Sequence, residues 1–180
     1  MSGGRGSAFE RLVAASVEGL EARGCFLLQT SPRFVPQKFL PSGKCVGYFA
    51  SKGGLDFYGH YYGRFVTFDC KSCKLKTRFP LDSIHGHQAH MVGHAHLLGG
   101  IAFFLIEMAE LDGGPRYYAL TWPVLEPYWS KYRLGLEGAS SIPLAVLESE
   151  CIEVKTHGGG FLDILSLLEK LTKRGLRDAS

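Results

Sequence analysis

The sequence predicts an α/β fold in which a mixed β-sheet is flanked by helices. Short apolar or alternating runs recur between residues 25 and 156, and such runs are typical of strands. Segments with apolar residues at helical spacing precede, interrupt and follow these runs. Because domains average roughly 150 residues, we expect the 180 residues, 1–180, to form a single domain.

The first predicted helix begins near residue 7. Ser7 and Glu10 have the spacing of a capping box, with Ser7 at the N-cap. Gly24 is placed to end this helix, and the apolar run over residues 25–30 predicts a short strand. The apolar residues that recur at helical spacing are Phe9, Leu12, Val13, Val17 and Leu20.

A segment poor in core-forming residues follows. Three prolines and one glycine fall within residues 31–44, and these residues predict a loop or a protruding arm. Residues 44–51 predict a strand, which Lys52, Gly53 and Gly54 end. We therefore expect residues 31–50 to form a short arm outside the core.

The next segment predicts a hairpin. Residues 56–62 and 64–72 read as two strands joined at Gly63. Because side chains alternate along a strand, Asp69 and Lys71 should point the same way. The opposite face of the second strand should carry Val66, Phe68 and Cys70.

The remaining elements alternate between helices and strands. In order, the sequence predicts a helix that Pro80 opens and that ends near Leu98, strands over 101–110 and 116–122, a short helix over 123–133, a helix with Pro143 at its first position, a strand over 151–156 and an amphipathic helix over 162–171.

Composition excludes several classes of protein. With 46% hydrophobic and 12% aromatic residues, the chain is not a disordered one. No window has the roughly 18 uninterrupted apolar residues of a membrane span, and the N-terminus lacks the apolar region of a signal peptide. We therefore expect a cytoplasmic protein with no membrane partner, whose five cysteines are reduced.

The net charge of +3 is small, but the basic residues are clustered. Residues 64–78 contain five basic side chains and one acid. A local basic stripe on a nearly neutral protein suits an anionic partner such as DNA, and solvated charge on a surface hairpin explains it equally well. Aromatic residues are interleaved with this stripe; they either pack in the core and a dimer interface or stack on unpaired bases.

The sharpest chemical feature is the pair Asp56 and Asp69 with Lys71. The hairpin places Asp56 across from the second strand, so the two carboxylates can approach each other. Close carboxylates repel unless they share a proton or a cation, and Mg²⁺ is held by one or two carboxylates. Glu10 could reach the same site from the first helix. A surface ion pair between Asp69 and Lys71 is the plain alternative.

Zinc is a rival hypothesis. Cys70 and Cys73 form a CxxC, and structural zinc often combines this motif with histidines. Residues three apart on an extended strand face opposite ways, which argues against joint chelation. The histidines that crowd the next predicted helix are His85, His87, His90, His94 and His96.

The order of these motifs resembles the RecU-type Holliday junction resolvases of the PD-(D/E)xK nuclease superfamily. The resemblance runs from Arg5-Gly6 through the hairpin at 56–71, the segment 77–90 and the apolar strand from Gly100 to the regions around Ser141 and Leu162. It implies a restriction-endonuclease-like fold and a homodimer that nicks opposing strands of branched, four-way DNA. It also implies Mg²⁺ as the cofactor, with Mn²⁺ as a substitute.

The resemblance further implies roles for single residues. Asp56 and Asp69 would be the metal carboxylates, with the backbone carbonyl of Cys70 as a third ligand, and Lys71 would be the catalytic lysine. Glu10 and Gln88 would complete the catalytic site. The residues expected to bind DNA are Arg5, Arg64, Lys74, Lys76 and Arg78.

The chain departs from the family pattern in two places. Asp69 stands where the bacterial members carry glutamate, and residues 31–50 are shorter than the family's stalk, which would suit a phage-encoded member. Two other functions stay open: a restriction-like or repair endonuclease that cuts duplex DNA, and a DNA-binding module without catalysis. The presence of all four residues Glu10, Asp56, Asp69 and Lys71 argues against the second.

Overall fold

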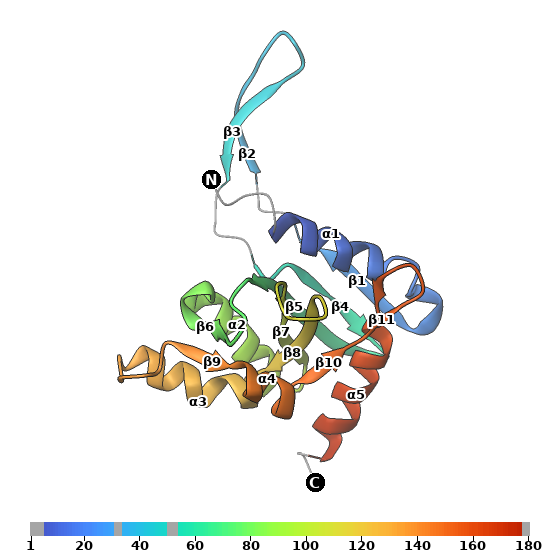
Figure 1. Ribbon diagram of the computed structural model, residues 1–180. Coiled ribbons are helices and arrows are strands. Elements are labelled where there is room, and N and C mark those ends of the chain that lie inside the picture. Colours follow the sequence, from blue (N-terminus) through green and yellow to red (C-terminus); the bar gives the residue numbers. More distant parts are fainter. Residues whose placement is uncertain (1–5, 31–33, 50–53, 178–180) are drawn as a thin grey trace.

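A six-stranded sheet forms the body of the protein in the computed structural model, which describes residues 6–30, 34–49 and 54–177 (Figure 1). The strand order is β1-β4-β5-β7-β8-β10. β5 and β7 are parallel and the other neighbours are antiparallel, which confirms the predicted mixed sheet. The strands are β1 (Cys25–Gln29), β4 (Phe57–Tyr61), β5 (Arg64–Cys73), β7 (Ile101–Met108), β8 (Arg116–Thr121) and β10 (Ile152–Val154).

Helices cover both faces of this sheet. α1 (Gly6–Val17) and α5 (Ile164–Arg177) pack on one face, and α2 (Gly86–Leu97), α3 (Trp122–Arg133) and α4 (Leu144–Glu150) pack on the other. Each face therefore has its own hydrophobic core. The first six residues of β7 are all buried, because a strand covered on both faces needs apolar side chains in both directions.

The hairpin of β4 and β5 is confirmed. Tyr62 and Gly63 connect the strands with φ of 44° and 78°, and two successive positive φ values define the tight turn that suits the twist of a hairpin. In the core beneath, the rings of Phe57 and Phe68 stack with centroids 4.9 Å apart, and Phe68 stacks on Phe103 at 4.8 Å. The hairpin is thus anchored to the neighbouring strand β7.

The arm is confirmed as a two-stranded hairpin that projects from the body (Figure 1). β2 (Phe34–Phe39) pairs with β3 (Cys45–Phe49) in antiparallel fashion. The alternative of a loop is wrong for residues 34–39. The strand tolerates Pro36 because the register shifts directly after it, and irregular positions are where strands accept proline.

Several predicted element boundaries are wrong. Ser7 lies inside α1 and is not its N-cap. α1 ends at Val17, and Gly24, with φ of 70°, closes a separate 3-10 turn, η1 (Glu21–Arg23). Pro80 does not open a helix. It ends β6 (Arg78–Pro80), which pairs with β9 (Ser141–Pro143) and leads through η2 (Leu81–Ser83) to α2.

The C-terminal third differs in detail. Pro143 is the last residue of β9 and precedes α4. The small hairpin of β11 (Thr156–His157) and β12 (Phe161–Leu162) was not predicted, and it delays the start of α5 to Ile164. Within the part of the chain that the structure describes, no helix combines the length and apolarity needed to cross a membrane.

Candidate active site

The predicted carboxylates meet where β4 begins beside the second half of β5. The register pairs Phe57 with Phe68, so Asp56, one residue before β4, reaches the main chain next to Asp69. Oδ2 of Asp56 accepts a hydrogen bond of 2.8 Å from the backbone N–H of Cys70. The backbone of β5 therefore holds Asp56 beside Asp69, as the hairpin pattern predicted.

Asp69 is the most enclosed charged residue of the site, with 1% of its side chain exposed. Its Oδ1 accepts a hydrogen bond of 2.8 Å from Nε2 of Gln88, and its Oδ2 lies 2.7 Å from Nζ of Lys71. Burial raises the pKa of Asp69 to about 6 and outweighs the lowering by Lys71. Asp69 and Lys71 share a face as predicted, but their pair is buried rather than a surface ion pair.

Glu10 joins this group from α1. Burial and the negative charge of Asp56 raise the pKa of Glu10, whereas Lys71 lowers it. Burial also raises the pKa of Asp56, and Asp56 and Glu10 both raise that of Asp69. Three acids thus interact around one lysine, which leaves an excess of negative charge in a partly desolvated site.

This donor set fits a hard cation. Mg²⁺ in proteins is typically held by one or two carboxylates together with water and phosphate oxygens. A cation would also relieve the repulsion that adds to burial in raising the pKa of Glu10 and of Asp69. Among the described residues, no three His, Cys, Asp or Glu side chains are grouped closely enough to hold an ion. The predicted ligand set contains only two such side chains, Asp56 and Asp69. Its third member, the main-chain carbonyl of Cys70, stays a prediction.

Gln88 has two roles in the site. It occupies the third position of α2, where its Oε1 accepts a hydrogen bond of 3.2 Å from the N–H of His85 at the N-cap. Its Nε2 donates to Asp69 on β5. One buried amide therefore ties the start of α2 to the central carboxylate.

The residues predicted to bind DNA are scattered. Arg5 lies outside the described residues. Lys74 and Arg78 are exposed beyond the site end of β5, and Nζ of Lys76 lies 2.6 Å from Oδ1 of Asp112. Arg64 starts β5 at its far end, where it donates to the carbonyl oxygen of Gly99 at 2.9 Å.

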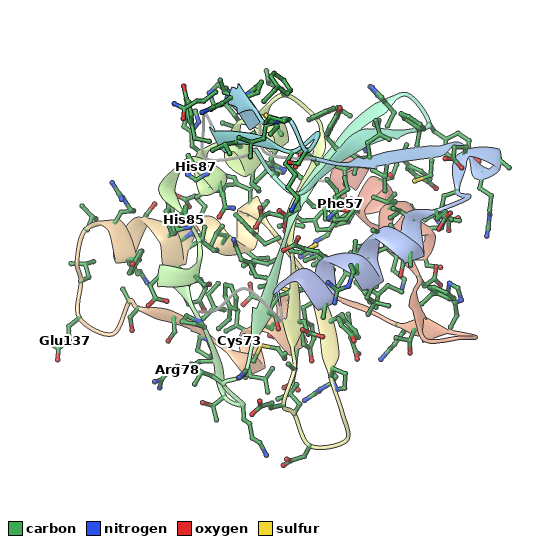
Figure 2. All side chains as sticks on the ribbon, turned by 90° about the horizontal axis from the view of Figure 1, so that it is seen from above. Phe57, Cys73, Arg78, His85, His87 and Glu137 are labelled. Carbon is green, nitrogen blue, oxygen red and sulfur yellow. The ribbon has the colours of Figure 1, made fainter. Side chains whose placement is uncertain are left out.

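The alternation of side chains along β5 argues against the zinc hypothesis. Cys70 is buried in the core under α1, and Cys73 in the core under α2, so the two thiols face opposite sides of the sheet. In Figure 2, which looks down on the side of the arm, Cys73 lies near Arg78, apart from His85 and His87 at the start of α2.

The aromatic residues of the hairpin divide between two roles. Phe57, Tyr61 and Phe68 are buried in the core, whereas 45% of Tyr58 and 74% of Tyr62 is exposed. Only the exposed rings could stack on a base. Outside the hairpin, the sequence also offers Trp122, Tyr128 and Trp129 for a dimer interface. All three pack, partly buried, against the core under α2.

Sequence reasoning missed Glu107 near the site. Its Oε2 accepts a hydrogen bond of 2.5 Å from Oγ of Ser72, the residue after Lys71. The feature that would have revealed Glu107 is the parallel pairing of β5 with β7, which places Ser72 opposite Glu107. This pairing joins segments separated by a helix, and local periodicity does not reveal it.

Known proteins resemble this chain in sequence. Residues 4–170 match the protein family described as Recombination protein U. A protein named Holliday junction resolvase RecU from Staphylococcus carnosus (strain TM300) is 31% identical over 146 residues, which cover 78% of this chain and 69% of that protein. A protein of the same name from Staphylococcus aureus (strain JH9) is 30% identical over 124 residues, which cover 69% of this chain and 57% of that protein. The chain thus spans less than two thirds of the second relative.

Proposed function

The chain belongs to the RecU family, and from this premise we propose that it is an endonuclease that resolves four-way DNA junctions by paired, symmetric nicks. The observation that carries the proposal is the cluster of Glu10, Asp56, Asp69 and Lys71 at one end of the β4–β5 hairpin. The cluster lies on a sheet with helices packed on both faces, and such a scaffold suits the positioning of a phosphodiester for hydrolysis.

We propose Mg²⁺ as the cofactor, with Mn²⁺ as a substitute. Asp56 and Asp69 would hold the ion, together with the carbonyl of Cys70. When bound, such an ion polarises a phosphate and makes a water molecule more acidic. The excess of carboxylates around Lys71 supports a cation at this place.

The remaining residues of the cluster would act on the DNA and the attacking water. Lys71, whose side chain is 15% exposed, would orient the water or stabilise negative charge on the phosphate. Glu10, at the edge of the cluster, would take up a proton or hold water. Gln88 would keep Asp69 in place, since it donates to Oδ1 from the fixed start of α2.

The DNA would lie across the side of the molecule that carries the cluster. Lys74 and Arg78 support this placement, because both are exposed near the site end of β5. Their charges would contact phosphates, which position DNA without reading its sequence. Lys76 would first have to leave Asp112, and Arg64 lies too far along β5 to share in this contact.

We propose that the protein acts as a homodimer. A four-way junction has approximate two-fold symmetry, and one cluster per chain supplies one nick at a time. An isologous dimer would place two clusters symmetrically through one interface. The arm is a candidate for this interface, because Val46 and Tyr48 of β3 are each about half exposed.

A cleavage assay tests the proposal. The substrates are a labelled four-way junction and a linear duplex with the same arm sequences, each with Mg²⁺ or with EDTA. We expect symmetric nicks in the junction only, and only with Mg²⁺. Equal cleavage of the duplex would indicate a duplex nuclease, and binding without cleavage would indicate a non-catalytic DNA-binding module. Light scattering of the free protein and of its junction complex checks the dimer.

A further inference from the structure

A cavity lies at the end of the sheet opposite the candidate active site. Its volume is about 570 Å³, and it opens between the end of α2, the start of α3 and α5. Arg64 reaches it from β5, and Arg174 and Leu171 reach it from α5. His96 and Leu97 border it from the last turn of α2.

The cavity is separate from the cluster of acids. Arg64 precedes Asp69 by five residues on the same strand, which corresponds to a separation of about 17 Å along β5. Arg64 and Asp69 also point to opposite faces of the sheet, because Val66, Phe68 and Cys70 follow Arg64 on the α5 side. The phosphodiester that the cluster would cut therefore lies outside this cavity.

The charge of the cavity is positive. Of the described residues that line it, three can carry positive charge and none is acidic. Arg64 donates to the carbonyl oxygen of Gly99 and Arg174 to that of Glu150, each at 2.9 Å. A guanidinium has five N–H donors, so each arginine is held by a main-chain oxygen and keeps further donors for a carboxylate.

The walls of the cavity are apolar. Ile101 and Leu171 form buried parts of it. At its rim, 75% of Leu97 is exposed, and 82% of the adjacent Leu98. Two neighbouring leucines exposed to this extent beside an open cavity indicate a surface for a partner. A phosphate backbone needs no such apolar surface, whereas a peptide side chain does.

We propose that this cavity docks a short acidic segment of another protein. Its carboxylates would pair with Arg64 and Arg174, and a bulky apolar side chain beside them would pack on Leu97 and Leu171. Positive charge attracts the segment, and burial of the apolar side chain holds it. This site is independent of the proposed nuclease activity, because it shares no residue with the cluster of acids.

Selection from a phage-displayed library of random peptides tests the proposal. The full chain serves as bait, and the most enriched peptides are synthesised with a fluorescent label. We expect them to combine Asp or Glu with Leu, Ile or Phe. Their affinity should fall at least about tenfold with Arg174→Gln and with Leu97→Ser, and stay unchanged with Lys173→Gln. Lys173 is exposed on α5 and does not line the cavity.

Four results would overturn the proposal. Enriched peptides without acids, or no enrichment over empty beads, would exclude an acidic ligand. Equal loss of affinity with Arg174→Gln and Lys173→Gln would reduce the effect to net charge. Displacement of the peptides by duplex DNA or by a second copy of the chain would assign the cavity to that occupant. The Arg174→Gln variant should cleave the junction at the wild-type rate. This measurement separates a failure of the docking proposal from a failure of the proposed nuclease function.

Discussion

Replacing Asp69 with asparagine should make the metal-free protein more stable at neutral pH while abolishing cleavage. Asp69 is 1% exposed, and burial raises its pKa from 3.8 to about 6. The folded state therefore holds this carboxyl's proton more tightly than the unfolded state does. Asparagine has nearly the same shape, retains an oxygen for Gln88 and carries no charge.

The size of the effect follows from the pKa shift. A rise of the carboxyl pKa from 3.8 to about 6 on folding makes ionised Asp69 cost about 3 kcal/mol. Because the pKa is raised in the folded state, this cost is absent below pH 3.8, grows as the pH rises to 6 and is fully present above it. The pKa of about 6 already includes the attraction of Lys71, but an asparagine that keeps its oxygen toward Gln88 turns its NH2 group toward Nζ of Lys71. Two donors facing each other cost about 1 kcal/mol. We therefore expect Asp69→Asn to gain about 2 kcal/mol at pH 7.5.

Urea denaturation in EDTA at several values from pH 4 to pH 8 measures this gain. The difference in unfolding free energy between Asp69→Asn and wild type should increase from pH 4 to pH 6 and then level off. Asp112→Asn is the matched control, because Asp112 is 93% exposed and pairs with Lys76 at the surface. Such pairs contribute about 1 kcal/mol or less, so this variant should follow the wild type at every pH.

A second arm of the same experiment adds Mg²⁺. A ligand that binds only the folded state stabilises it, so Mg²⁺ should stabilise the wild type and leave Asp69→Asn unchanged. The effect on the wild type should weaken as the pH falls below about 6, because a proton then competes for Asp69. Parallel pH curves for the two proteins, or a loss of stability in Asp69→Asn at pH 7.5, would refute the reasoning.

Three further predictions concern the site and its scaffold. Lys71→Ala should slow cleavage by about a hundredfold or more with unchanged junction affinity; an equal fall in affinity would make the lysine a phosphate anchor. Replacing Lys74 and Arg78 with glutamine should reduce the slope of log K against log salt by roughly 0.9 per lost phosphate contact, measured by anisotropy with Lys173→Gln as the control; an unchanged slope would exclude them from the DNA surface. Gly59→Ala should destabilise the fold by about 3 kcal/mol or more in urea denaturation, because a Cβ there would lie 1.9 Å from a main-chain oxygen of β1; near wild-type stability would contradict the pairing of β1 with β4.

The sequence predicted best what lies within one hairpin. The alternation of Asp69, Cys70 and Lys71 set their faces correctly, and Gly63 marked the turn. Both signals depend on residues close in the chain, whose geometry is fixed by the period of a strand. The approach of Asp56 to this strand followed from the same local pairing.

The errors arose where pairing is long-range. Pro80 suits the first turn of a helix as well as the end of an edge strand. The choice depends on β9, which begins at Ser141 and pairs with β6. No local pattern indicates that pairing, and the prolines of the arm were misleading in the same way because Pro36 lies at a shift in register.

The chemistry of Asp69 shows why the residues of a site can be predicted while their properties cannot. Residues 69–71 alone predict a carboxylate next to a lysine on one face of the strand. Its burial depends on α2, which covers the sheet from another part of the chain and brings Gln88 to Oδ1. The same contact fixes the start of α2 through His85. The pKa of Asp69 is therefore a property of how α2 packs on the sheet, and a substitution that loosens this helix should change the protonation of the site without touching an acid.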